Sequence, residues 1–370
     1  MTIKGDAPDL PPHLRGKVIL SIDAMGGDSG PGPIVHGMAI ACAKNPNIGF
    51  IVHGPQENLK QLIAKRRIED RCVIRDADGV VTMDAKPSQV MRHGKGTSMW
   101  STIESVRNGE STVAISCGNT GALMAVSMVR LRKIPGVNRP AIACLWPSRS
   151  PGGFSIMLDV GADIRADQDD LLQYTHMGVS YARNGLGLEL PRVGLLNVGT
   201  EEHKGRAELK VANEIIADAA GNGRFDYFGF VEGGDIPSGK VDVIVTDGFT
   251  GNVALKTAEG TAGFIRDSLR SAFKHSLLSR FASLLAYTSL ARLGKRIDPR
   301  RVNGGVFLGL NGTVVKSHGS ADATGVAAAI KLAFQLAESG FTERLTARML
   351  AHLEATQDPD QTGAFEGGKS

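Results

Sequence analysis

The chain has 370 residues, of which 42% are hydrophobic and 22% are charged, and its formal net charge is +4. This is the composition of a globular protein, and it excludes a disordered chain, a collagen and a disulfide-rich scaffold. No uncharged apolar run approaches the roughly 18 residues of a membrane-spanning helix, and the start of the chain lacks the apolar segment of a secretory signal. The four cysteines are scattered, which indicates a reducing compartment and argues against a thiolate zinc site.

Short apolar segments alternate with longer amphipathic segments along most of the chain. The expected strands are 17–23, 49–53, 72–76, 112–116, 141–146, 155–159, 192–197, 242–246 and 306–310. The expected helices include 34–43, 57–65, 98–108, 122–131, 168–184, 206–219, 253–273 and 323–337. This alternation predicts an α/β fold with a mostly parallel sheet sandwiched by helices. We expect one domain over 17–356, with disordered tails at 1–16 and 357–370.

Glycine is abundant, with 46 residues, and it gathers where the expected strands end. Glycine joins small polar residues in six such segments, which are 23–28, 116–121, 159–162, 197–205, 247–252 and 317–320. Ligands of open α/β sheets bind beyond the carboxyl ends of the strands, so we expect these loops to line one crevice. Glycine allows close approach of backbone N–H groups, and helix N-termini favour anions. The pattern favours an anion or phosphate pocket, although each loop alone could be a helix cap or a turn.

One nucleotide-binding motif is absent from the sequence, a second is imitated, and one cysteine is a candidate nucleophile. No GxGxxG follows the first expected strand, which weakens a dinucleotide site. Residues 234–240 imitate a P-loop, but Val241 replaces the required Ser or Thr and a strand follows, so we interpret them as a turn. Cys117 lies beside Asn119, yet no histidine stands near it in the sequence, which favours a small buried thiol over a nucleophile.

Together the motifs resemble the phosphate acyltransferases of bacterial phospholipid synthesis, which are acyl-[acyl-carrier-protein]:phosphate acyltransferases. The resemblance covers roughly 17–354 and rests on seven segments in the family's order. These segments are 22–28, 118–122, 139–141, 158–161, 194–202 with Lys204 and Gly205, 246–253, and 316–320. The resemblance implies a fold like that of the isocitrate and isopropylmalate dehydrogenases and of phosphotransacetylase, assembled as a homodimer.

The implied reaction moves a long-chain fatty acyl group from the acyl carrier protein thioester to inorganic phosphate, giving acyl phosphate for glycerophospholipid synthesis. Phosphate is itself the nucleophile and the thiolate leaves readily, so no cofactor or metal is expected. The protein has to supply a phosphate cradle, donors to the oxyanion and orientation. The alternatives are another enzyme of the same fold, either a short-chain phosphotransacetylase or a hydroxyacid dehydrogenase, and a non-enzymatic membrane-binding adaptor.

The resemblance also implies which residues form the site. Lys204 would hold phosphate or the thioester carbonyl, and Asn252 would donate a hydrogen bond to the oxyanion. Asp residues of the loops are expected to orient the backbone rather than act as bases, and His318 has a phosphate contact or a structural role. The predicted substrate- and phosphate-binding residues are Asp23, Gly26, Gly27, Asp28, Asn119, Thr120, Gly121, Asp159, Asn197, Thr200, Asp247, Gly251, His318 and Gly319.

Residues 268–297 contain no Asp or Glu but six Lys and Arg residues, within an amphipathic segment at 264–297. Such a segment is typical of a membrane-surface contact or a dock for an acidic partner, although its apolar stripe could instead pack in the core or a dimer. The predicted contact residues are Arg270, Lys274, Leu277, Arg280, Phe281 and Leu284.

With the resemblance, this segment predicts a cytoplasmic protein that associates peripherally with the inner face of the plasma membrane. Acyl carrier protein is strongly acidic and is the expected partner, together with inorganic phosphate and the downstream glycerol-phosphate acyltransferase. No nucleic acid partner is expected, since the net charge of +4 is small.

Overall fold

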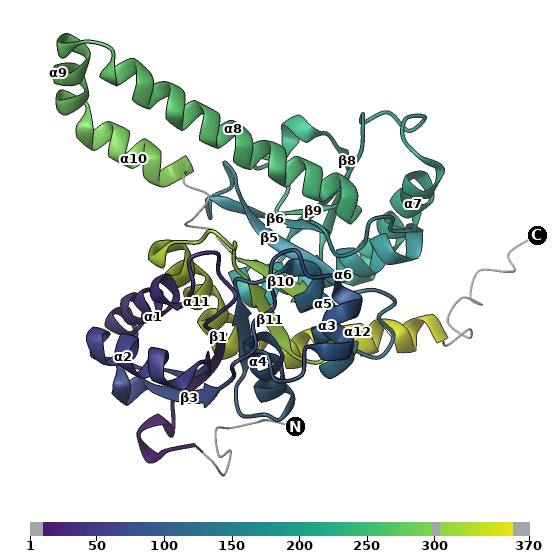
Figure 1. The fold of residues 1–370 in the computed structure, drawn as a ribbon. Coiled ribbons are helices and arrows are strands. Elements are labelled where there is room, and N and C mark those ends of the chain that lie inside the picture. Colours follow the sequence, from purple (N-terminus) through teal and green to yellow (C-terminus); the bar gives the residue numbers. More distant parts are fainter. Residues whose placement is uncertain (1–9, 298–303, 358–370) are drawn as a thin grey trace, which may run out of the picture.

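The computed structural model describes residues 10–297 and 304–357. Its strands form a single eleven-stranded sheet in the order β3-β2-β1-β4-β11-β10-β5-β6-β9-β7-β8 (Figure 1). The strands are β1 (Val18–Asp23), β2 (Ile48–Gly54), β3 (Cys72–Asp76), β4 (Val113–Ser116), β5 (Ala141–Pro147), β6 (Phe154–Leu158), β7 (Arg192–Leu196), β8 (Asp226–Val231), β9 (Val243–Val245), β10 (Gly305–Leu308) and β11 (Thr313–Lys316).

The helices cover both faces of the sheet. They are α1 (Pro31–Lys44), α2 (Gln56–Arg66), α3 (Pro87–His93), α4 (Ser98–Arg107), α5 (Thr120–Arg130), α6 (Gln168–Leu186), α7 (Ala207–Gly223), α8 (Gly248–Lys274), α9 (Leu277–Leu285), α10 (Tyr287–Ile297), α11 (Ala323–Glu338) and α12 (Phe341–Gln357). Val113 and Ile115 of β4 pack in one core cluster with α1, α6 and α11, whereas Ala114 between them packs with α4 and α5. Successive side chains of a strand point to opposite faces, so each strand packs against the helices on both sides of the sheet. The predicted sandwich is confirmed.

The direction of the strands changes in the middle of the sheet. Among the described strands, seven neighbouring pairs are parallel and three are antiparallel, which confirms the mostly parallel sheet. The antiparallel pairs are β11–β10, β10–β5 and β5–β6. Three consecutive reversals make β6, β9, β7 and β8 run opposite to β1, β4 and β11. Three of the six loops therefore follow strands at one edge of the sheet and three follow strands at the opposite edge. That all six loops line one crevice stays a prediction.

Part of the expected N-terminal tail is packed. Leu10 and Leu14 are buried against Ile19 and Ile51, so the ordered domain begins before residue 17. Residues 1–9 and 358–370 of the two expected tails lie outside the described residues.

An arm projects from the body and is formed by α8, α9 and α10 (Figure 1). The predicted helix 253–273 is confirmed, but it begins earlier, at Gly248, and is capped by Asp247. Ser276 caps α9, whose backbone N–H of Ser279 donates to the Ser276 hydroxyl at 3.1 Å. No helix in the described part of the chain is both long and apolar enough to cross a membrane.

Candidate active site

The loops that follow β1, β4 and β11 form one compact unit, here called the first loop group, with residues 23–28, 116–121 and 316–320. The three strands are neighbours, and Ser116 is in register with both Asp23 and Lys316. The backbone N–H of Asp28 donates to the Gly319 carbonyl at 2.9 Å. A Cβ on Gly26 would lie 2.6 Å from the Gly118 nitrogen, so only glycine allows this approach.

Asp23 is the buried centre of the first loop group. Its Oδ1 accepts from the Ser98 hydroxyl and its Oδ2 from the Ser116 hydroxyl, each at 2.6 Å. Burial raises the pKa of this carboxyl, and the serine hydrogen bonds oppose that shift. Both oxygens are occupied by the protein, so Asp23 orients the loops, as predicted for the aspartates.

Asn119 closes the second loop of this group. Its Oδ1 accepts from the Ala122 backbone at 3.0 Å as the N-cap of α5, and its Nδ2 donates to the carbonyls of Met83 and Ala85. Thr120 and Gly121 are exposed in the first turn of α5.

Cys117 is only 3% exposed, and burial raises the pKa of its thiol to about 11. The burial confirms the interpretation of this residue as a small buried thiol, and a nucleophilic cysteine would need a lowered pKa.

Lys316, which the sequence analysis gave no role, ends β11 inside the first loop group. Its Nζ donates to the Cys117 carbonyl at 3.3 Å and also to the Ser317 carbonyl. Burial lowers the pKa of this ammonium to about 8, and the charge of Lys256 acts in the same direction, against Asp28 and Asp23. The signal in the sequence was its place at the start of the 316–320 segment of the family resemblance.

The last loop of this group also carries the predicted His318. This side chain is exposed, with its Nδ1 2.8 Å from the Ser320 hydroxyl. Gly319 packs closely on the Asp28 carboxylate. A Cβ at position 319 would lie only 2.8 Å from the Asp28 Oδ1.

The loops that follow β6, β7 and β9 form the second loop group, with residues 159–163, 197–205 and 247–252. Leu158, Val245 and Leu195 are in register across these three strands. Asp159 accepts from the backbone of Ile142 at 2.8 Å and from Asp163 at 2.6 Å, as well as from Gly161 and Ala162. Burial raises its pKa and these hydrogen bonds oppose the shift. Asp159 therefore also orients a loop.

The start of α8 packs tightly on the 159–163 loop. Asp247 caps the helix by accepting from the Thr250 backbone at 2.8 Å, and it also accepts from the Arg206 guanidinium. A Cβ on Gly251 would lie 1.9 Å from the Asp159 carbonyl oxygen, which explains the glycine. Asn252 follows with an exposed side chain that lies against Gly161.

Lys204 belongs to the same group as Asn252. Its Nζ is 2.7 Å from the Glu201 carboxylate, and this hydrogen bond raises the pKa of Lys204. Asn197 is buried and shapes the loop, since its Nδ2 donates to the Lys204 carbonyl at 3.2 Å and its Oδ1 accepts from Val198. Thr200 is exposed on this loop. The Arg206–Asp247 ion pair then joins the 197–205 loop to the start of α8.

The two loop groups differ in how their cations are paired. In the second loop group and its border, Lys204 pairs with Glu201, Arg206 with Asp247, and Arg139 with Asp163. Lys316 makes no ion pair with any described residue. Within residues 10–297 and 304–357, no group of three His, Cys, Asp or Glu side chains is placed to hold a metal ion.

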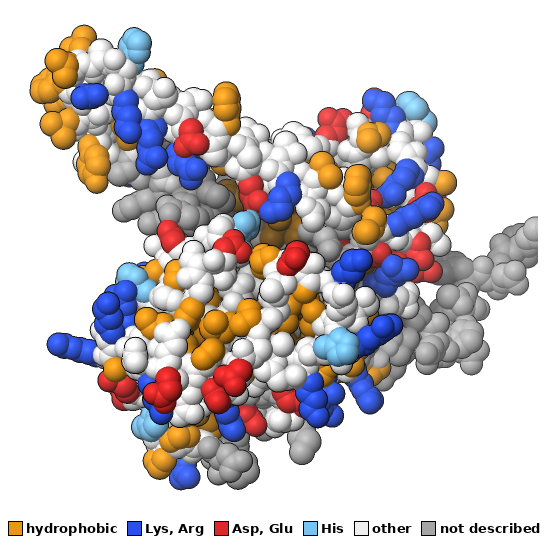
Figure 2. All heavy atoms as spheres, viewed as in Figure 1, with side chains coloured by type: hydrophobic (Ala, Val, Ile, Leu, Met, Phe, Trp, Pro, Cys, Tyr) orange, Lys and Arg blue, Asp and Glu red, His pale blue; other side chains and the backbone are white. Residues whose placement is uncertain are grey.

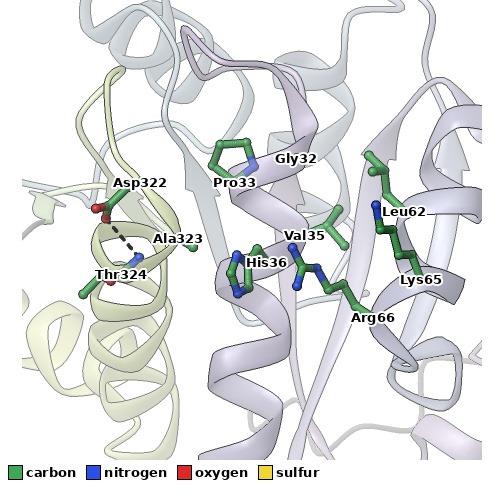
Figure 3. Close-up of a pocket in the computed structure, with 10 residues that line it drawn as sticks. All are labelled: Gly32, Pro33, Val35, His36, Leu62, Lys65, Arg66, Asp322, Ala323 and Thr324. Carbon is green, nitrogen blue, oxygen red and sulfur yellow. Dashed lines mark hydrogen bonds between the residues drawn. The ribbon is translucent and has the colours of Figure 1, made fainter.

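A surface groove of about 450 Å³ lies between α1, α2 and the start of α11 (Figure 3). His36, Lys65 and Arg66 line one side of the groove, and Asp322 and Thr324 line the other. The Thr324 backbone N–H donates to the Asp322 carboxylate at 3.0 Å. The described residues that line this groove include no predicted site residue, so it is separate from the candidate active site.

The predicted contact residues of the arm are exposed. Leu277 is 81% exposed, Leu284 70% and Phe281 59%, which excludes packing of this stripe in the core of the same chain. Arg270, Lys274 and Arg280 line a cleft of about 540 Å³ between the arm helices.

Solved structures share this fold at low sequence identity. The chain is similar to a phosphotransacetylase from Streptococcus pyogenes, with a TM-score of 0.58, 15% identity, and coverage of 87% of this chain and 94% of that chain. It is also similar to the EutD phosphotransacetylase from Staphylococcus aureus, with a TM-score of 0.55, 14% identity, and coverage of 88% and 96%. A Salmonella typhimurium structure described as a 4-hydroxythreonine-4-phosphate dehydrogenase has a TM-score of 0.51 at 14% identity, with coverage of 86% and 99%. These likenesses confirm the predicted fold class.

Closer relatives define the family. Residues 18–344 match the family model described as fatty acid synthesis protein. A protein from Paracoccus denitrificans is 71% identical over 339 residues, covering 91% of this chain and 92% of its own length, and is named phosphate acyltransferase. A protein from Dinoroseobacter shibae with the same name is 71% identical over 346 residues, covering 93% and 90%. The chain belongs to this family and is an acyltransferase, which confirms the resemblance seen in the sequence.

Proposed function

We propose that this enzyme transfers a long-chain fatty acyl group from acyl carrier protein to inorganic phosphate, giving acyl phosphate for glycerophospholipid synthesis. The observation that carries the proposal is the 71% identity, over at least 90% of both chains, to relatives named phosphate acyltransferase. The fatty acid synthesis description of the family supports the acyl group as a fatty acyl chain.

The proposed chemistry needs no nucleophile from the protein. A phosphate oxygen forms a bond to the thioester carbonyl carbon, and the carbon–sulfur bond breaks with its electron pair on sulfur. The proton of hydrogen phosphate passes to solvent or to the leaving thiolate. The developing oxyanion and the phosphate then require preorganised donors and cations. The buried Cys117 is consistent with this route, because its raised pKa disfavours an acyl-enzyme at that thiol.

Lys204 and Asn252 are the proposed catalytic residues in the second loop group. The ammonium of Lys204 would exchange Glu201 for a phosphate oxygen or for the thioester carbonyl. Lys204 is suited to this exchange because its ion pair with Glu201 is partly exposed and therefore weak. The exposed amide of Asn252, held against Gly161 at the start of α8, would donate to the oxyanion.

The test is an assay with palmitoyl-acyl carrier protein that follows free thiol and hydroxylamine-trapped acyl phosphate together. We expect thiol release that requires phosphate and matches the trapped product. Release without phosphate, or no release, would contradict the proposal. Acetyl-coenzyme A as donor, and NAD⁺ reduction with hydroxyacids, separate it from the phosphotransacetylase and dehydrogenase alternatives.

We also propose that the arm contacts an anionic membrane surface. Figure 2 shows apolar side chains gathered at the arm's tip and Lys and Arg side chains along α8. At the tip, Leu277 and Leu284 are largely exposed, and residues 268–297 carry no acidic residue to repel anionic lipid. An exposed apolar face beside cations is the arrangement that binds membrane interfaces. This contact would place the enzyme at the inner face of the plasma membrane.

Co-sedimentation with vesicles of an anionic phospholipid tests the membrane contact. The double variant Leu277→Asp/Phe281→Asp should remain in the supernatant while the unmodified enzyme sediments. Leu190→Asp is the matched control, because Leu190 is 61% exposed but lies on the body. Equal sedimentation of the arm variant would contradict the membrane contact. Loss of acyl carrier protein binding alone would assign the arm to that partner instead.

We further propose a homodimer. The α8 helix exposes the apolar side chains of Phe249, Val253 and Phe264, and large exposed apolar side chains are typical of subunit interfaces. Light scattering should give twice the chain mass of 39.1 kDa, whereas the mass of one chain would contradict the proposal.

A further inference from the structure

Lys316 is a largely buried cation that makes no ion pair with any described residue. Its ammonium is held at the end of β11 by two backbone carbonyls, those of Cys117 and Ser317. An ammonium carries three hydrogen-bond donors, so two carbonyls leave one donor. No described carboxylate forms an ion pair with it, although removing a charge from water is costly unless the charge is compensated.

The α8 helix brings a second cation toward the same place. Asn252 and Lys256 are four residues apart, so they share one face of α8. Ala254, Leu255 and Ala258 of the adjacent face pack on the core beneath the helix. The positive charge of Lys256 lowers the pKa of Lys316, in the same direction as burial.

We propose that Lys316 is a phosphate-binding residue of the transfer reaction, with Lys256 adding positive charge from α8. The ammonium of Lys316 would donate its remaining hydrogen to a phosphate oxygen at the mouth of the 116–119 and 317–319 loops. The inference rests on the proposed function for the identity of the substrate. It differs from that function in placing a phosphate contact in the first loop group, away from Lys204.

A purely structural role makes a different prediction. Lys316 could serve only to hold the loops at Cys117 and Ser317 together, since it donates to both carbonyls. Its loss would then lower the melting temperature and affect kcat and KM together. A binding role predicts instead a selective change in the KM for phosphate.

The kinetic experiment compares Lys316→Gln, Lys316→Arg and the control Lys60→Gln at saturating palmitoyl-acyl carrier protein. Lys60 is a surface lysine of α2, paired with Glu57. Lys316→Gln should raise the KM for phosphate about ten- to a hundredfold, as expected for a lost charge-assisted hydrogen bond, with a smaller change in kcat. The KM for phosphate of Lys316→Arg should stay closer to that of the unmodified enzyme. The KM of Lys60→Gln should equal the unmodified value.

The pH dependence supplies a readout that a structural role does not move. In the unmodified enzyme the KM for phosphate should rise above pH 8, because Lys316 loses its proton near its pKa of about 8. Lys316→Arg should remove that rise, because arginine stays charged. The other groups whose charges act on Lys316 are Cys117, Asp28, Asp23 and Lys256, and all are retained in this variant.

A binding measurement on the unmodified enzyme completes the test without turnover. A neutral acetylating reagent is applied with and without inorganic phosphate, and modified lysines are quantified by mass spectrometry. Phosphate should slow acetylation of Lys316 and leave Lys60 unchanged. Absence of protection, or an unchanged KM in a folded Lys316→Gln variant, would overturn the inference. If Lys316→Gln does not fold, the protection of Lys316 from acetylation by phosphate is the deciding result. If the unmodified enzyme makes no acyl phosphate, the proposed function fails, while protection still decides whether Lys316 binds phosphate.

Discussion

The two loop groups are built from similar residues but use their charges differently. In the second, Lys204, Arg206 and Arg139 each pair with a carboxylate. In the first, Lys316 contacts only backbone carbonyls among the described residues. The family resemblance points to the second loop group for catalysis, whereas the cation without an ion pair to a described residue lies in the first. If both proposals hold, phosphate binding at Lys316 and oxyanion stabilisation at Asn252 come from loops of the two halves of the sheet.

The largest expected effect tests the second loop group. Lys204→Ala and Asn252→Ala should each lower turnover about 10²–10³-fold, the usual loss when one transition-state donor is removed. Lys60→Ala is the control for Lys204, because Lys60 forms the same i,i+3 ion pair with a glutamate on the surface of α2. Turnover is measured as phosphate-dependent thiol release. Near-full activity of folded Lys204→Ala would remove that residue from the mechanism and leave Lys316 as the principal cation.

The next effect concerns the packing that joins α8 to the 159–163 loop. Gly251→Ala should lower the free energy of unfolding by about 1–3 kcal/mol, because its Cβ would meet the Asp159 carbonyl oxygen at 1.9 Å. Gly260→Ala, in the same helix with nothing within 4 Å of its Cβ, should instead stabilise by about 0.5–1 kcal/mol. Urea unfolding compares them. Equal free energies of unfolding in the two variants would mean that the backbone at the start of α8 shifts to accommodate the added methyl group.

An effect of similar size, spread over about two pH units, tests the buried polar contacts beneath the first loop group. His53 lies between the hydroxyls of Ser21 and Ser101, each 2.8 Å away, and burial lowers its pKa to about 3. In the unfolded chain this histidine binds a proton near pH 6.5. Stability should therefore fall as the pH drops below 6.5 and toward 3, by about 1.4 kcal/mol per pH unit within that window.

The measurement is urea unfolding between pH 7 and pH 4.5, with His53→Gln compared with the exposed control His93→Gln. The slope should become shallower only in His53→Gln. Identical slopes in the two variants would show that His53 is protonated in the folded protein.

The smallest stability effect is expected in the arm. Leu277→Asp/Phe281→Asp should leave the free energy of unfolding within about 0.5 kcal/mol of the unmodified value, because exposed side chains lose few contacts. Thermal unfolding checks this in the same samples used for vesicle binding. A large destabilisation would mean that Leu277 and Phe281 are packed in solution, and it would contradict a free arm tip.

Most of the fold could be predicted from local patterns. Strands such as β2 and β9 are short apolar runs that are buried along their whole length, and such runs stand out in a sequence. The strand β11 (Thr313–Lys316) was not among the expected strands. The strand β8 was also missed; its apolar run is interrupted by Gly229, which has a positive φ of 86°. The reversal at β10 depends on long-range pairing with β11 and β5, which no local pattern encodes.

In the candidate site, too, some residues could be recognised from the sequence and others could not. Asn119 and Asp247 could be recognised because a side-chain cap between a strand and a helix is a local signal. The importance of Lys316 could not, because its burial depends on the Cys117 loop and the charge acting on it comes from α8. Groups whose properties arise from packing between distant segments become visible only in the folded chain.

The central claim is that phosphate itself attacks the thioester. The most direct measurement mixes the enzyme with a stoichiometric amount of palmitoyl-acyl carrier protein without phosphate, and records free thiol and the intact enzyme mass. The account predicts no thiol burst and no added palmitoyl mass until phosphate is supplied, when thiol and acyl phosphate form together. A thiol burst equal to the enzyme concentration, with a palmitoyl group on the protein, would reveal an acyl-enzyme and contradict the account.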